Sequence, residues 1–348
     1  MIITNRLLQK MIYSLRNVYR VNKDIKMAKN GLLIGFILLL IATVFSAMRI
    51  GEQVVEDTEA TFNHNVAVQK FQATLAVLSQ ESTSDLVAKY QHNPNILLFF
   101  NTIEDDQVDQ ANIPDFAKIT DTRVKKVLFF AFIRNSIIEQ NQLIQKQRDV
   151  LTAIRNTYLA KHRLSARQLT QFNKLVSRYH VNPELSFDER LNSLWHRVDI
   201  IPPRLVMVQA ANESAWGTSR FAQQGLNLFG HWCYVKGCGM VPKRRSSNAI
   251  HEVRVYDSLS QAVKRYFYNL NTHKLYKAFR DIRYSLRQGK KPLSAIQLAF
   301  GLINYSTKRE AYVHVLVQMI KHNEPYFGLP TASESLSVEG EQTEDTSS

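Results

Sequence analysis

The stretch Val206-Met-Val-Gln-Ala-Ala-Asn-Glu-Ser-Ala-Trp-Gly-Thr-Ser-Arg220 joins an apolar run to a single carboxylate, Glu213, and then to small, turn-forming residues. Pro203, which suits the first position of a helix, opens the run. Burial and the negative end of a helix both disfavour the charged form of Glu213, so its pKa should be raised. A raised pKa suits a general acid that works near neutrality. The alternative is that Glu213 caps or salt-bridges a surface helix end.

Composition indicates a mainly globular chain with a basic body. The chain has 348 residues, of which 45% are hydrophobic and 21% charged, and its formal net charge is +14. This length allows two domains and a sizeable core. The positive charge is not confined to the amino-terminal tail, because residues 31–330 taken together carry a net charge of +13 (14 − 6 + 5). Such a balance suits an anionic partner, which can be a nucleic acid, a membrane surface or an acidic polymer.

Residues 31–48 contain no charged side chain and are almost entirely apolar. About 18 apolar residues are just enough to cross a bilayer as a helix. Seven basic residues and one acid precede them, which by the positive-inside rule predicts a cytoplasmic N-terminus. We therefore expect an uncleaved single-span anchor, with all later residues outside the cytoplasm, a placement that argues against nucleic acid as the partner. The alternative is a cleaved signal peptide, because Phe45-Ser-Ala47 ends in small residues.

Several helices are indicated by spacing and by capping residues. Apolar residues at three- and four-residue spacing from Asp121 to about Ala160 predict a long amphipathic helix or a helix pair. Ser165-x-x-Gln168 and Ser186-x-x-Glu189 read as capping boxes. Thr307-x-x-Glu310 is expected to cap the last helix.

The region after Gly217 is rich in loops, and residues 250–256 alternate in the manner of one short, half-buried strand. The chain's two cysteines, Cys233 and Cys238, lie in this region. No further cysteine or close histidine pair in the sequence completes a four-ligand zinc site, so we expect no metal. In an oxidising compartment the expected outcome is a disulfide that makes a tight loop locally rigid.

Acidic and aromatic side chains are the chemistry that this region offers. The sequence contains no nucleophile elbow, no glycine-rich phosphate loop and no Ser/His/Asp set at a recognisable spacing. Carboxylates beside flat aromatic faces are typical of glycoside hydrolysis. Each aromatic residue taken alone is more often part of a core, which is the alternative for every one of them. The candidates are Glu213, Glu252, Trp216, Phe229, Trp232, Tyr234, Tyr305 and Tyr312.

These residues carry a resemblance to a known family. Residues 209–221, followed by Asn227-Leu-Phe-Gly230, resemble the signature of the N-acetylglucosaminidase domains of glycoside hydrolase family 73. The Trp232-Cys-x-x-x-x-Cys-Gly-x-Val-Pro242 loop, Pro114-Asp-Phe-Ala-Lys-Ile119 and residues 165–181 resemble Bax-like proteins of Gram-negative bacteria. The resemblance covers about residues 110–328.

The resemblance implies an α+β fold, with a mainly helical, lysozyme-like domain and a small β-lobe, that cleaves N-acetylglucosaminyl bonds in murein. The catalytic acid of the family maps onto Glu213, and its tyrosine near the last helix maps onto Tyr305. Family members often carry a second carboxylate in the β-lobe, for which Glu252 is the candidate. The alternatives are that Glu252 pairs with Arg254 across the sheet, and that the substrate's N-acetyl group makes a nucleophile unnecessary. The expected substrate contacts are Trp216, Asn227, Phe229, Trp232 and Tyr312.

We therefore expect a membrane-anchored periplasmic enzyme of the inner membrane that acts on peptidoglycan glycan strands without a cofactor. The expected segments are a basic cytoplasmic N-terminus (1–30), a transmembrane anchor (31–48), a poorly defined helical stalk (49–110), a helical region packing on the catalytic domain (111–185), the glucosaminidase domain (186–330) and a disordered acidic tail (331–348).

Two other functions stay open at this point. A lytic transglycosylase or muramidase shares a helix ending in Glu-Ser, but such folds usually continue into Gly-Leu-Met-Gln, where this chain has Asn227-Leu-Phe-Gly230. A non-catalytic murein-binding scaffold that kept the cleft is the second. The sequence identifies no protein partner.

Overall fold

The computed structural model describes residues 113–328 except 244, 247 and 248, together with positions 46, 49, 66, 68–70 and 72–74. The expected N-terminus, anchor, stalk and tail thus lie almost wholly outside the described residues and stay predictions. Within the described part of the chain, no helix combines the length and apolarity needed to span a membrane.

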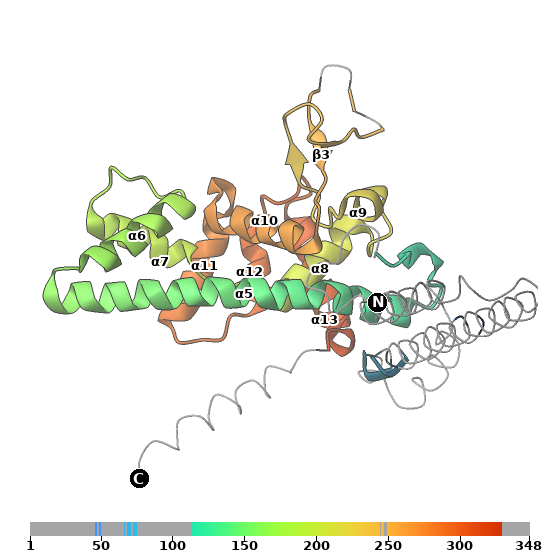
Figure 1. Ribbon diagram of the computed structural model, residues 1–348, viewed down its shortest axis with the longest axis horizontal. Helices are drawn as coiled ribbons and strands as arrows, with labels where there is room; N and C mark the ends of the chain where they lie inside the picture. The colour runs from blue at the N-terminus through green and yellow to red at the C-terminus, as the bar shows by residue number, and fades with distance from the viewer. Residues whose placement is uncertain are drawn as a thin grey trace, which may run out of the picture. The chain divides into compact units, whose positions relative to one another are not determined.

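One long helix, α5 (Thr122–Lys161), runs along the whole body in Figure 1. It begins at Asp121, whose side chain accepts hydrogen bonds from the backbone N–H groups of Arg123 at 2.8 Å and Val124 at 3.3 Å. It ends at His162, which adopts the left-handed conformation. The spacing of apolar residues thus corresponds to one continuous helix of 40 residues rather than a helix pair.

In the view of Figure 1, α6, α7, α10 and α11 lie above α5 and α13 lies below it, and α8 and α10 both contact α5. The other described helices are the 3-10 helices η2 (Phe116–Lys118), η3 (Lys274–Tyr276), η4 (Phe300–Leu302) and η5 (Glu324–Tyr326), and the α-helices α6 (Ala166–Arg178), α7 (Phe187–Arg197), α8 (Pro203–Ser214), α9 (Arg220–Gly225), α10 (Leu259–Thr272), α11 (Lys277–Gln288), α12 (Ala295–Ala299) and α13 (Glu310–His322).

The helix starts confirm two sequence predictions and correct a third. Ser165 and Ser186 form the two capping boxes with Gln168 and Glu189, respectively. The predicted cap at Thr307 is wrong, because α13 begins only at Glu310 after Arg309, and no side chain caps it. Glu310 itself lies in the first turn, where a negative charge interacts favourably with the helix dipole.

A small antiparallel sheet in the order β1-β3-β2 projects from the helical body in Figure 1. Its strands are β1 (Trp232–Cys233), β2 (Gly239–Met240) and β3 (Glu252–Arg254). The predicted strand over residues 250–256 is therefore real but shorter. Gly239 is required in β2, because a β-carbon there would lie 2.0 Å from the carbonyl oxygen of Val253. The described residues, which are mainly helical with a small antiparallel sheet, confirm the α+β prediction.

Two hydrophobic clusters meet at a buried ion cluster. The larger cluster holds the first half of α5 together with α8, α10, α12 and α13, and the smaller one holds the second half of α5 with α6 and α7. Between them, the carboxylate of Asp199 lies 2.9 Å from Arg287 and 3.5 Å from Arg148. Arg283 donates to the backbone carbonyls of Asp199 and Ile200 at 3.1 Å. Burial alone would raise the pKa of Asp199, but these arginines lower it below its usual value.

Candidate active site

Glu213 lies on the last turn of α8, where the local sequence fixes a tight exit from the helix. The Ser214 hydroxyl donates to the Ala210 carbonyl at 2.6 Å and accepts from the Gly217 N–H at 2.8 Å. Gly217 has a positive φ of 73°, and a β-carbon there would lie 2.5 Å from the Phe116 ring. The Glu-Ser-x-x-Gly spacing therefore ends the helix and holds the carboxylate at the surface of the core.

The carboxylate of Glu213 is half-buried and receives hydrogen bonds rather than a salt bridge. Asn212 donates to its Oε1 at 3.1 Å, and Tyr312 is its second hydrogen-bond partner. Burial raises the pKa of Glu213, and although these bonds and the charge of Lys308 lower it, the net pKa stays above its usual value. No cation of the described residues lies within ion-pair distance of Glu213. The alternative of a salt-bridged helix end is therefore not what the structure shows.

A chain of buried hydrogen bonds leads to Glu213. The Tyr266 hydroxyl donates to Oε1 of Gln209, and Nε2 of Gln209 donates to the Tyr312 hydroxyl at 2.8 Å. Gln209 is fully buried and lies one helical turn before Glu213 on α8. Because the Tyr312 oxygen accepts from Gln209, the proton of Tyr312 is free to point to the carboxylate. Gln209 thereby positions Tyr312 for Glu213.

Tyr305 lies beside this chain. Its ring stacks on the ring of Tyr312 with centroids 5.6 Å apart and planes 2° apart. Its hydroxyl donates to the backbone carbonyl of Phe229 at 3.0 Å. The structure thus brings Tyr305, Tyr312 and Glu213 together, although the predicted helix cap at Thr307 does not hold Tyr305 in place. Burial raises the pKa of Tyr305 well above its usual value, so this phenol stays protonated.

The Asn227–Gly230 loop passes next to Glu213. A β-carbon at Gly230 would lie 3.9 Å from Oε2 of Glu213, so the loop backbone passes close to the carboxylate, and the positive φ of 67° favours glycine at this position. Asn227 is buried, donates to the carbonyls of His231 and Arg254 at 2.8 Å, and accepts from the His231 N–H at 2.9 Å. Phe229 is buried against Tyr266 at 4.3 Å. Asn227 and Phe229 therefore shape the loop from inside the fold, and their direct contact with substrate stays a prediction.

The two candidate tryptophans occupy different surroundings. Trp216 is half-buried and packs against Phe129 at 5.8 Å and Phe130 at 5.3 Å, centroid to centroid. Trp232 is 53% exposed and stacks flat on His251, with centroids 4.3 Å apart. Trp232 therefore offers a free aromatic face on which a sugar ring can stack, whereas much of Trp216 is used by the core. Tyr234, two residues beyond Trp232, is also exposed.

The disulfide predicted between Cys233 and Cys238 is present, with their Cα atoms 6.2 Å apart. Glu252 lies opposite Cys233 in the sheet and is buried inside this loop. Its Oε1 accepts from the Gly237 N–H at 3.0 Å and its Oε2 from the Gly239 N–H at 2.9 Å. These bonds lower the pKa of Glu252, so the carboxylate is ionised and fastens the loop. No ion pair joins it to Arg254 among the described residues, and its catalytic role stays a prediction.

Cys233, Cys238 and Glu252 lie close together but do not make a metal site. The two sulfur atoms and a Glu252 oxygen lie within 4.8 Å of one another. Because the sulfurs are bonded to each other, neither is the thiolate that a metal requires.

Comparison with known proteins identifies the family. Residues 188–325 match the Glucosaminidase family, described as Mannosyl-glycoprotein endo-beta-N-acetylglucosaminidase. Over 223 residues the chain is 33% identical to "Protein bax" of Escherichia coli strain K12. The aligned segment covers 62% of this chain and 75% of that protein. The chain belongs to the Bax-like glucosaminidase-domain proteins. No solved structure matches it.

In this Bax-like chain, α5 and α6 precede the matched residues, yet α5 contributes much of the core behind Glu213. Sequence reasoning missed Gln209, Tyr266, Asn212 and Lys308 as parts of the site. Gln209 and Asn212 could have been found, because each is a polar residue in the mostly apolar run that ends at Glu213. Tyr266 and Lys308 carry no such signal, since only the tertiary fold brings them near.

Proposed function

We propose that this chain is a peptidoglycan hydrolase that cleaves N-acetylglucosaminyl glycosidic bonds in murein, with Glu213 as the general acid. One observation carries the proposal: in a glucosaminidase domain, Glu213 is half-buried, free of any described ion pair and raised in pKa. Such a carboxyl group holds its proton at a higher pH than an exposed glutamate does, so it can protonate the leaving glycosidic oxygen.

The second half of the displacement would come from Glu252, a water molecule or the acetamido group of the substrate. Both oxygens of Glu252 already accept backbone hydrogen bonds inside the disulfide loop. We therefore favour a water or the acetamido group, either of which needs only space beside the Gly230 backbone. In this proposal Tyr305 and Tyr312 hold the substrate or stabilise the transition state, and Trp232 stacks on a sugar ring.

We also propose that the enzyme is anchored in the inner membrane and acts in the periplasm. The apolar sequence of residues 31–48 and the bases before it support an inner-membrane anchor with the enzyme domain in the periplasm, where murein lies. The disulfide is consistent with an oxidising compartment.

A lytic transglycosylase is the second candidate, and one observation favours keeping it. Among the described residues, the charge that acts on Glu213 is that of Lys308, and both oxygens of Glu252 are bound by backbone N–H groups inside the disulfide loop. A reaction that needs only one acid would fit such a site.

Digestion of purified murein sacculi tests the proposal against a non-catalytic scaffold. The chain is expected to release soluble glycan fragments, because Glu213 supplies the proton that the reaction needs. Sedimentation of the protein with sacculi measures binding in the same samples. Binding without any release of fragments would identify a scaffold and contradict the proposal.

Replacing Lys308 by Gln is expected to move the basic limb of the activity profile to higher pH. The charge of Lys308 lowers the pKa of Glu213, so its removal lets that pKa rise, and the acid stays protonated to a higher pH. The measurement is kcat/KM against pH for both proteins. Lys321→Gln, which removes an exposed charge from the far end of α13, is the matched control. A basic limb that stays in place, or moves to lower pH, would contradict this electrostatic account.

Tyr312→Phe and Gln209→Met are expected to act as one unit. Each removes a hydrogen bond from the chain that ends at Glu213, so each should lower kcat by about tenfold or more. Tyr312→Phe should also shift the basic limb upward, because the lost bond lowers the pKa of Glu213. The double variant should be little worse than either single one, since both act through the same contact. Fully additive losses would show that Gln209 does not act through Tyr312.

A further inference from the structure

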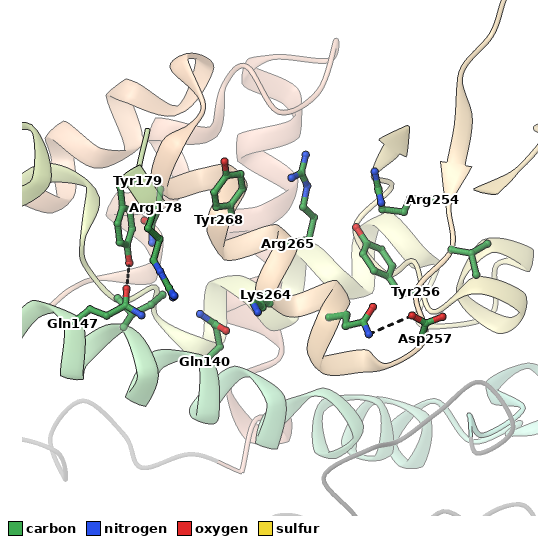
Figure 2. A pocket seen from close by; sticks show the side chains of 14 residues that line it. Gln140, Gln147, Arg178, Tyr179, Arg254, Tyr256, Asp257, Lys264, Arg265 and Tyr268 are labelled. Atoms are coloured by element: carbon green, nitrogen blue, oxygen red, sulfur yellow. Dashed lines mark hydrogen bonds between the residues drawn. The ribbon is translucent and has the colours of Figure 1, made fainter. Parts of the chain in front are cut away.

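The structure contains a pocket whose lining does not include Glu213. It has a volume of about 520 Å³ and is lined by α5, the end of α6, residues 254–257 and α10. Figure 2 shows its side chains, among them Gln140 and Gln147 on α5 and Lys264, Arg265 and Tyr268 on α10. None of the residues that line it belongs to the acid, the tyrosine pair or the aromatic contacts of the proposed enzyme site.

The pocket is strongly basic. Arg178, Arg254, Lys264 and Arg265 line it, against a single carboxylate, that of Asp257. Asp257 accepts a hydrogen bond from Gln261 at 3.4 Å and forms no ion pair with these cations. Among the residues that the structure describes, no carboxylate lies within ion-pair distance of any of the four.

The buried ion cluster of the same protein shows the contrast. There a single carboxylate, that of Asp199, satisfies Arg148 and Arg287 and approaches Arg283 to 4.0 Å. In the pocket, four positive charges from three segments of the chain (α6, β3 and α10) line one space and lack such an anion. Charges of one sign gathered around a pocket repel each other, and an anionic ligand would relieve that repulsion.

The other lining groups indicate what kind of anion fits. The side-chain amides of Gln140, Gln147, Gln261 and Asn271 and the three tyrosines Tyr179, Tyr256 and Tyr268 also line the pocket. Amides pair with peptide N–H and C=O groups, while arginine and lysine pair with carboxylates. A peptide that carries several carboxylates satisfies both sets of groups.

Arg254, one of the lining residues, contacts the loop that passes beside Glu213: its N–H donates to the His231 carbonyl at 2.9 Å, and its carbonyl accepts from Asn227 at 2.8 Å. The charges of Arg254 and Arg265 both act on the ring of His231, and burial together with these charges lowers the pKa of His231 to about 3. His231 directly follows Gly230, the residue beside the Glu213 carboxylate. An acidic peptide in the pocket would therefore lie close to a polymer held at Glu213.

We propose that this pocket is a binding site for acidic peptides supplied by another molecule. Arg178, Lys264 and Arg265 are exposed and Arg254 is half-buried, so the contacts are screened by solvent and the affinity comes from several of them acting together. Peptide binding to this pocket does not involve Glu213, so this proposal can be tested independently of the proposed hydrolysis. If the hydrolysis is correct, the peptide side chains of the substrate polymer are the natural source.

The test titrates the full-length chain with a hexaglutamate peptide and, separately, with a hexaglutamine peptide, using calorimetry at low salt. Hexaglutamate should bind and hexaglutamine should not, because only the former carries carboxylates. Raising the salt from about 50 to 200 mM should weaken the binding, since the contacts are screened. Lys264→Gln/Arg265→Gln should weaken it by about tenfold or more.

The control Lys161→Gln/Lys321→Gln removes the same charge at exposed positions that do not line the pocket. It should bind hexaglutamate nearly as well as the unchanged chain, and unchanged thermal unfolding of both variants would show that each is folded. Equal losses in the two double variants would mean that net charge alone attracts the peptide, which overturns the proposal. Equal binding of the two peptides would overturn it as well.

A further arm tests whether the chain's own acidic residues occupy the pocket. Residues 331–348 carry five acids and no base. Replacing Glu334, Glu339, Glu341 and Glu344 by Gln and Asp345 by Asn removes this internal competitor. Unchanged hexaglutamate binding supports a peptide from another molecule. Clearly tighter binding would assign the pocket to the chain's own tail and overturn the proposed source.

Discussion

Replacing Glu213 by Gln is expected to reduce the release of reducing ends from purified murein by about 10²- to 10⁴-fold, the usual contribution of a general acid. Glutamine preserves the shape of the side chain and can still accept from Asn212, but it has no proton to give. Binding to sacculi should persist, because the aromatic and loop surroundings of residue 213 stay in place. The measurement is a reducing-sugar assay paired with sedimentation of the protein with sacculi.

Glu184→Gln is the matched control for this variant. Glu184 is exposed and precedes the residues that match the glucosaminidase family. Its replacement should leave hydrolysis unchanged. Undiminished hydrolysis by Glu213→Gln would show that Glu213 is not the general acid. Loss of both hydrolysis and binding would instead indicate that the variant is misfolded.

Replacing Asp199 by Asn is expected to lower the free energy of unfolding by about 3–5 kcal/mol, as removal of one partner from a buried ion pair does. Asp199 is 2% exposed, and its carboxylate is the counter-charge for three buried or half-buried arginines. Without it, positive charge remains at the junction of the two hydrophobic clusters. Urea unfolding measures the difference. Asp281→Asn removes solvent-accessible contacts with Lys277 and His196 and should cost no more than about 1 kcal/mol.

The effect of Asp199 has a defined pH dependence. Its pKa in the folded chain is below the usual value, so its contribution is complete above the unfolded pKa of about 3.9 and is lost as pH falls through the folded pKa. The stability difference between the unchanged chain and Asp199→Asn should therefore narrow as the pH falls below about 4. A difference that is small at neutral pH, or that widens on acidification, would contradict this account.

Local signals in the sequence were sufficient for much of the fold. Asp121 and the apolar spacing behind it correspond to the start and path of α5, and Pro203 opens α8 as expected. Ser165 and Ser186 cap their helices because each carries its partner three residues on. The disulfide followed from two cysteines in one short loop.

The site was harder to predict, because its parts come together only through tertiary packing. Glu213 could be recognised from its own surroundings in the sequence, but its link to Tyr312 through Gln209 joins α8 to α13. Asn227 and Phe229 were identified by their resemblance to a family motif. The sequence does not tell whether the side chain of a motif residue contacts a substrate or packs inside the loop that it shapes. Their burial shows that both face inward.

The β-lobe shows why alternation alone is a weak guide. The alternation over residues 250–256 predicted a half-buried strand, but Glu252 is buried as well as its neighbour Val253. Its burial depends on the turn that Gly237 makes with a φ of 82°, which presents backbone N–H groups to the carboxylate. The prediction that Thr307 caps the last helix was also wrong because of a turn. The backbone from Leu302 to Arg309 forms hydrogen-bonded turns, and α13 begins only after them.

The identity of the sugar at the new reducing ends tests the central claim most directly. Murein is digested with the protein, the products are reduced with borohydride, and the terminal residues are identified by mass spectrometry. Cleavage of N-acetylglucosaminyl bonds predicts reduced N-acetylglucosamine at the ends, and none after digestion with Glu213→Gln. Anhydro-muramic or reduced muramic ends would contradict the account.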